Sequence, residues 1–146
     1  MARYSVGSRT VTNLPQAARG PGVFAGSTSG GFWLREIKVT NTTVTAVAVG
    51  ILYCTATGTQ VGGLTEVQTD DPSNAAPSET TFTSQSTDST GNVIDQVSLG
   101  AAIGSGFIFR WDKGEVWCPE GTGNGVVISC PTGTAQHLDF TIKWEK

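Results

Sequence analysis

Hydrophobic and polar residues alternate with a period of two along several short stretches, a pattern typical of β-strands that bury one face. In residues 32–41 the alternation predicts that Ile37 and Val39 point inward, with Trp33 on their face and Leu34 on the opposite one. Residues 93–99 and 138–144 alternate in the same way, residues 107–111 are rich in aromatic side chains, and residues 126–130 are apolar except for Ser129. These stretches predict strands, and residues 64–67 predict a further short one.

Residues 44–56 are apolar on both faces of the predicted strand. Val47, Val49 and Ile51 occupy one face, while Leu52 and Cys54 occupy the other. This pattern indicates a central strand that is covered on both sides. We expect another subunit to cover the second face, which predicts a closed oligomer such as a homotrimer.

Turn residues separate the predicted strands at short intervals. Asn41-Thr42-Thr43 suggests a hairpin between residues 32–41 and 44–56, and Asp112-Lys113-Gly114 suggests another between 107–111 and 115–118. Residues 70–91 are polar and predict an exposed excursion that only Phe82 anchors. About eight strands and no helix predict an all-β fold, an antiparallel β-sandwich or jelly-roll-like single domain.

Composition agrees with this fold class. The 146 residues include 21 Thr and 19 Gly, and only 14% are charged. Threonine fits a pleated sheet and glycine fits turns, whereas both weaken helices. One domain is the expectation for this length.

The N-terminal 31 residues differ from the rest. Between Asn13 and Gly31, two prolines and five glycines disfavour regular structure, so we predict an extended arm or edge segment at 1–31 and a sandwich domain at 32–146. Arg3, Arg9 and Arg19 make the arm basic, which suggests contact with an acidic surface of a neighbouring subunit or capsid. The alternative is that this segment, with a short edge strand at 3–7, folds back onto its own domain.

Charge and hydropathy exclude several classes of partner. The net charge is −3 and no run of Lys or Arg occurs, so nothing indicates nucleic-acid binding. No apolar stretch approaches the roughly 20 residues that span a bilayer, so we expect no membrane partner. The first residues lack the apolar block of a signal peptide, and synthesis in a cytoplasm is therefore expected.

The cysteines and the single histidine give little indication of catalysis. Cys54, Cys118 and Cys130 lack metal-site spacing and predict buried, reduced thiols, with Cys118–Cys130 as the pair to test for a disulfide. His137 lies on the polar face of a predicted strand, which favours a surface role. A small hydrolase is the alternative if a nucleophile lies near His137.

Acidic and glycine-rich stretches also favour structural roles. Asp70 and Asp71, with Glu66 and Glu79 nearby, predict a turn, and a calcium site is the alternative. The segment from Gly100 to Gly106 predicts a mobile connection, since no helix follows to complete a phosphate site. The sequence therefore predicts no catalytic, cofactor-binding or metal-binding residues and no cofactor.

Four tryptophans offer the remaining candidate chemistry. Trp33, Trp111, Trp117 and Trp144 predict packing in the core or at an interface. The alternative is stacking on sugar rings, as in a carbohydrate-binding β-sandwich module.

Several stretches taken together resemble a known class of protein. They are residues 32–43 (FWLREIKVTNTT), 63–67 (GLTEV), 70–72 (DDP), 98–107 (SLGAAIGSGF), 119–128 (PEGTGNGVVI) and 138–145 (LDFTIKWE). As a set they resemble small β-sandwich virion proteins of tailed bacteriophages, closest in type to capsid decoration, or cement, proteins. The resemblance covers roughly residues 32–144.

This resemblance implies a non-enzymatic structural protein on the capsid exterior, often a trimer, that binds the major capsid protein. It transfers no functional residues, and the N-terminal segment has no counterpart in it. A phage tail or baseplate protein would share the same composition and remains an alternative.

Overall fold

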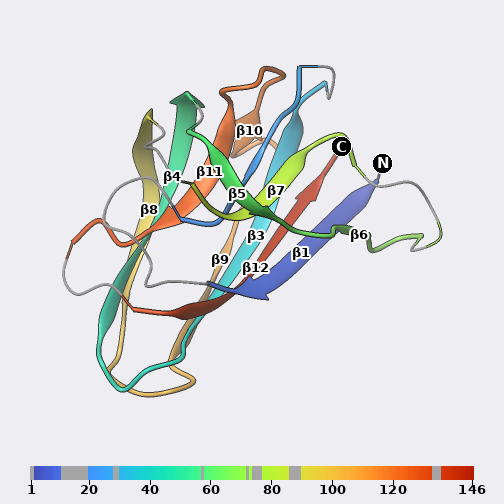
Figure 1. The fold of residues 1–146 in the computed structure, drawn as a ribbon. Helices are drawn as coiled ribbons and strands as arrows, with labels where there is room; N and C mark the ends of the chain where they lie inside the picture. The colour runs from blue at the N-terminus through green and yellow to red at the C-terminus, as the bar shows by residue number, and fades with distance from the viewer. Residues whose placement is uncertain are drawn as a thin grey trace.

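The structure is a computed structural model that describes residues 2–10, 20–27, 30–56, 58–71, 73, 77–85, 90–132 and 136–146. These residues form twelve β-strands and no helix, so none of them belongs to a helix that could cross a membrane. The predicted all-β class is confirmed. The strands make two antiparallel sheets packed face to face, a β-sandwich (Figure 1).

Sheet A contains β10 (Trp117–Cys118), β9 (Gly106–Arg110), β3 (Phe32–Asn41), β12 (Leu138–Glu145), β1 (Arg3–Arg9) and β6 (Val67–Gln68). Their order is β10-β3-β12-β1-β6, and β9 also pairs with β3. In Figure 1, β1, β12 and β3 lie side by side as the blue, red and cyan arrows.

Sheet B contains β5 (Gln60–Gly63), β7 (Thr80–Gln85), β2 (Gly22–Phe24), β11 (Gly125–Ser129), β4 (Val47–Ala56) and β8 (Thr90–Leu99). They are hydrogen-bonded in the order β5-β7-β2-β11-β4-β8. The polar stretch 70–91 thus contributes part of this sheet, and Phe82 is buried on β7 as its predicted anchor.

The main core lies between the sheets. Each long strand contributes every second side chain, and the largest fully buried members include Trp144, Phe32, Phe109, Leu34, Ile37, Ile51, Ile128, Leu138 and Ile142. Burial of this apolar surface is the dominant favourable contribution to folding.

The prediction that residues 44–56 form a central strand covered on both faces is confirmed. β4 lies between β11 and β8, and Val47, Val49 and Ile51 join the main core. Leu52 and Cys54 point to the other face, where a second buried cluster also contains Phe24, Phe82 and Val127. Because this face is covered within one chain, β4 needs no second subunit to bury its apolar residues.

The predicted alternation in residues 32–41 is wrong at its start. Lys143 of β12 pairs with Glu36, but the next residue, Trp144, pairs with Leu34. Arg35 is therefore an extra residue, a β-bulge that shifts the inward and outward phase of the strand. Leu34 is buried together with Ile37, whereas the prediction placed the two on opposite faces.

Neither predicted hairpin forms. β3 belongs to sheet A and β4 to sheet B, so the chain crosses between sheets through residues 42–46. β9 and β10 each pair with β3 and not with one another. In both cases the partners are distant in sequence: β3 pairs with β12, β4 pairs with β11 and β8, and β9 and β10 both pair with β3.

The N-terminal segment is not an arm outside the sandwich. β1 pairs with β12 over seven residues, and its Tyr4 and Val6 are buried. β2 pairs with β7 and β11, so both β1 and β2 are integrated into the sheets. Residues 11–19, with Leu14, Pro15 and Arg19, lie outside the described residues.

The basic side chains of this segment also find partners within the chain. Arg9 forms a bidentate pair with Asp139, at 2.6 and 2.9 Å, directly opposite on β12. Arg3 lies opposite Glu145, with Nε 3.7 Å from Oε2. Cross-strand pairing therefore explains these two arginines without the acidic external surface that the sequence suggested.

We predict that Val6→Ala destabilises the isolated protein by about 2 kcal/mol, because the lost methyl groups are buried in the core. Val6 is 3% exposed, and Val44, at 73%, provides the matched control. Val44→Ala should leave the free energy of unfolding nearly unchanged in urea denaturation. Equal midpoints for the two variants would show that β1 is not part of the cooperative unit.

Candidate functional site

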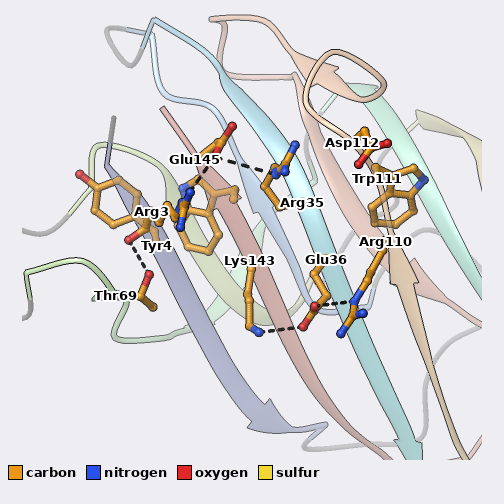
Figure 2. Close-up of a pocket in the computed structure, with 11 residues that line it drawn as sticks. Arg3, Tyr4, Arg35, Glu36, Thr69, Arg110, Trp111, Asp112, Lys143 and Glu145 are labelled. Atoms are coloured by element: carbon orange, nitrogen blue, oxygen red, sulfur yellow. Dashed lines mark hydrogen bonds and ion pairs between the residues drawn. The ribbon is translucent and has the colours of Figure 1, made fainter.

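A surface cleft lies on sheet A, where β1 begins and β12 ends (Figure 2). It encloses about 350 Å³, which is at the lower end of the range for small-molecule sites, roughly 300–1,000 Å³. The cleft is lined by Arg3, Tyr4, Arg35, Glu36, Thr69, Arg110, Trp111, Asp112, Lys143, Trp144 and Glu145.

The β-bulge at Arg35 builds one wall of this cleft. In a regular strand, consecutive side chains point to opposite faces. At the bulge, Arg35 and Glu36 both lie between the buried residues Leu34 and Ile37, and both line the cleft. The Arg35 carbonyl accepts a hydrogen bond from Trp111 N at 3.1 Å, which fixes the segment after β9 beside the bulge.

Glu36 lies at the centre of a cross-strand charge network. It pairs in register with Lys143 on β12 and with Arg110 on β9. Lys143 Nζ is 2.8 Å from Oε1 and Arg110 Nε is 3.0 Å from Oε2, as Figure 2 shows. The hydrogen bond from Lys143 is the main cause that lowers the pKa of Glu36, with Arg110 adding to it. Glu36 is therefore an anion held between two cations.

Glu145 is more buried than Glu36, and its distances to the nearest cations are longer. Its side chain is 5% exposed, and it lies between Arg3 Nε at 3.7 Å and Arg35 Nε at 3.9 Å. Both distances exceed that of a hydrogen bond. Nη1 of Arg35 is also buried and has no hydrogen-bond partner among the described residues. Two guanidinium groups thus share one distant carboxylate.

Aromatic rings support the charged groups from two sides. Trp111 stacks on Phe109, with centroids 6.0 Å apart and planes 4° apart. Trp144 stacks on Tyr4 with centroids 5.8 Å apart and is fully buried. Trp111 is partly exposed at the cleft, so the cleft combines fixed cations and carboxylates with one accessible ring. Such a lining is suited to binding a polar ligand.

The predicted packing role of the tryptophans holds for Trp144, which lies in the core. Trp33 and Trp117 form a tilted pair with centroids 4.6 Å apart on the neighbouring strands β3 and β10. They do not line the cleft, whereas Trp111 does. The structure therefore does not bring the four rings into one row.

His137 lies at the end of sheet A, away from the residues that line the cleft. Its Nδ1 is 3.0 Å from the carbonyl oxygen of Thr10, and its own carbonyl accepts a hydrogen bond from Thr42 Oγ1 at 2.9 Å. The Thr10 hydroxyl in turn accepts a hydrogen bond from Leu138 N. These contacts connect β1, β12 and the loop after β3, which is a structural role.

The four acidic residues singled out by the sequence do not converge. Asp71 accepts hydrogen bonds from the backbone and hydroxyl of Ser73, the predicted turn, and Asp70 accepts one from Arg3 N. Glu66 binds the Thr81 hydroxyl, and the buried Glu79 pairs with Lys146 Nζ at 3.2 Å. Within the described ranges, no group of three or more His, Cys, Asp or Glu residues could hold a metal ion.

The glycine-rich connection at 100–106 is a turn held by hydrogen bonds. Asn41 is buried, and its amide donates to the carbonyl oxygens of Gly100 at 3.0 Å and Thr45 at 2.7 Å. Gly104 N donates to the Asn41 carbonyl. One buried amide therefore joins the two loops that cross between the sheets.

Sequence reasoning missed the residues that form the cleft. It placed charged side chains on the outward face of residues 32–41, which was the available signal, but did not connect them to Arg3, Arg110 or Lys143. That connection depends on strand order, because β12 lies between β1 and β3.

All three cysteines are buried, as predicted, and Cys118 on β10 lies in the main core. Burial raises the pKa of the Cys118 thiol, and nearby Cys54 raises it further. We predict that Ellman's reagent at pH 8 modifies no thiol in the folded protein and three in urea. Rapid modification of the folded protein would contradict the burial of these side chains.

We predict that Glu36 stabilises the folded protein at neutral pH and loses this effect in acid. Its pKa is lowered on folding, so the stabilisation is present above the ordinary glutamate range and disappears as the pH falls through the lowered pKa. Glu36→Gln should therefore flatten the loss of stability in acid, measured by urea unfolding from pH 7 to pH 3. In a Lys143→Met background the same substitution should have a smaller effect, and an equal effect would exclude Lys143 as the cause.

No family model matches this chain, and no match was found among curated proteins.

Proposed function

We propose that this chain is a non-enzymatic structural protein of a phage virion, which decorates and stabilises the outer capsid surface through contacts between subunits. The virion assignment derives from the resemblance of the strand and turn sequences described above. The structural support is a single feature, an apolar side of the sandwich suited to contact with another protein.

This apolar side is formed by the free edges of both sheets. β9 and β10 lie on the free side of β3, β8 lies on the free side of β4, and residues 100–105 connect β8 to β9. Five of the eight exposed large apolar side chains among the described residues lie here: Val93, Ile103, Phe107, Ile108 and Trp117. By register, Val93 lies on the outer face of sheet B beside Leu52, and Ile108 lies on the outer face of sheet A beside Lys38, so the exposed apolar groups surround this edge of the sandwich. Exposed apolar groups gathered on neighbouring elements are typical of interaction surfaces.

The apolar side also contains a groove of about 290 Å³. Tyr53 and Ile94 of sheet B line one part of the groove, and the consecutive residues Glu115, Val116 and Trp117 line the other. Aromatic residues are enriched at the centres of protein interfaces, where they provide large, rigid contact areas.

The edge strand β8 favours contact through side chains over extension of the sheet. Asp95 pairs with Ile51 and Val93 with Leu52, so Ile94 is an extra residue that interrupts the ladder. Bulges of this kind hinder the addition of a further strand to an edge. The partners in this proposal are other copies of the chain, in a homotrimer, and the major capsid protein.

A pair of matched double variants tests the proposal. Ile103→Asp with Ile108→Asp places two charges on the apolar side, whereas Val61→Asp with Val67→Asp places them on β5 and β6 at the opposite edges. We expect wild type and the Val61/Val67 variant to exceed the 15.2 kDa monomer mass in size exclusion with light scattering, and the Ile103/Ile108 variant to be monomeric.

The same variants should also differ in whether they co-sediment with capsids. We expect wild-type protein to pellet with decoration-free particles of its phage and the Ile103/Ile108 variant to remain in the supernatant. A wild-type protein that is monomeric and does not bind particles would contradict the proposal.

A further inference from the structure

We propose that the cleft on sheet A binds a carboxylate-bearing sugar of the uronic acid class. This site is separate from the apolar side, and the proposal does not depend on the virion assignment. The cleft is lined by four cations, three carboxylates and the partly exposed Trp111.

Two arginines flank Glu145 in the cleft. Arg3 and Arg35 carry two positive charges, and the carboxylate between them lies 3.7 and 3.9 Å from their Nε atoms. The Arg3 side chain is 67% exposed and the Arg35 side chain 33% exposed, so the guanidinium groups still have donors open to an external acceptor in the cleft. A ligand carboxylate would supply it, because guanidinium groups match carboxylates geometrically.

Carboxylates also line the cleft and restrict which anions it can bind. Glu36, Asp112 and Glu145 line the same cleft as the four cations, so a simple anion would meet repulsion as well as attraction. Asp112 is the exposed member of the three, and its carboxylate can accept hydrogen bonds from hydroxyl groups. A ligand that carries one carboxylate and several hydroxyls therefore fits this mixed lining better than acetate or an acidic side chain does.

Trp111 provides the cleft with a partly exposed aromatic side chain. Its ring is partly exposed at the cleft and held parallel to Phe109, with planes 4° apart. A fixed aromatic face is suited to the apolar face of a pyranose ring. The backbone hydrogen bond from Trp111 N to Arg35 O fixes the backbone of Trp111 beside that of Arg35, and both residues line the cleft.

Galacturonic acid and galactose form a matched pair of probes, since they differ only in the carboxylate at C6. We expect galacturonic acid to cause saturable shifts of cleft residues in two-dimensional NMR of the full chain, with galactose at least tenfold weaker. Arg35→Gln should weaken galacturonic acid at least tenfold. Arg9→Gln should not, because Arg9 belongs to the same sheet but lies outside the cleft.

Trp111→Ala tests the stacking step, and the shifts of residues outside the cleft report whether each variant remains folded. We expect weaker binding of galacturonic acid with the rest of the spectrum preserved. If Arg35→Gln disturbs the fold, Arg35→Lys provides a second variant, which retains the charge but loses the bidentate geometry and should also weaken binding.

Four results would overturn the proposal. Acetate that saturates the same shifts with equal affinity would indicate a simple anion site. The dipeptide Gly-Asp binding more tightly than galacturonic acid would indicate a site for a protein carboxylate. Equal binding of galactose, or no saturable shift with any probe, would exclude a uronic acid site.

Discussion

The pairing of β12 with β1 on one side and β3 on the other is the interaction on which sheet A depends. It aligns Arg3 to Arg9 with Glu145 to Asp139 and places residues 33–41 along the other edge of β12. The three strands turn Val6, Ile142 and Ile37 toward the core, so backbone pairing and apolar burial support one another. Because these contacts join residues far apart in sequence, the domain has a high contact order, which is typical of slowly folding β-sandwiches.

The same pairing assembles the charged cleft. Arg3, Glu145 and Arg35 come from three adjacent strands of sheet A, and Glu36, Lys143 and Arg110 occupy matched positions on β3, β12 and β9. The outer face of the sheet therefore carries these charges together with uncharged residues such as Ser5, Thr40 and Thr141, whereas the inner face carries core residues. Most of these charges neutralise each other, but the guanidinium of Arg35 is not fully satisfied within the described chain.

Local pattern predicted much of the fold. The strand at 44–56, with Ile51 on one buried face and Leu52 on the other, followed from its doubly apolar sequence, and β11 followed from its apolar run. The partners of each strand were not predictable in this way. Hairpins were expected from turn residues, whereas β3 and β4 enter different sheets, because pairing is decided by distant apolar faces.

The N-terminal segment shows a different limit. Glycine and proline near Pro21 indicated that no regular structure forms there, but Gly22–Phe24 is a strand between β7 and β11 of sheet B. Gly22 leaves no room for a side chain there, since an added Cβ would lie 2.4 Å from the Val126 carbonyl oxygen. A glycine that breaks regular structure in isolation can therefore be required by close packing in a sheet.

The β-bulge at Arg35 links the regularity of the fold to the chemistry of the cleft. Without Arg35, Leu34 and Glu36 would be consecutive and would face Trp144 and Lys143 in an uninterrupted ladder. Deletion of a single codon would thus restore ideal strand geometry and remove the unsatisfied guanidinium at once. The geometry of β3 and the charge of the cleft are therefore encoded together, in one codon.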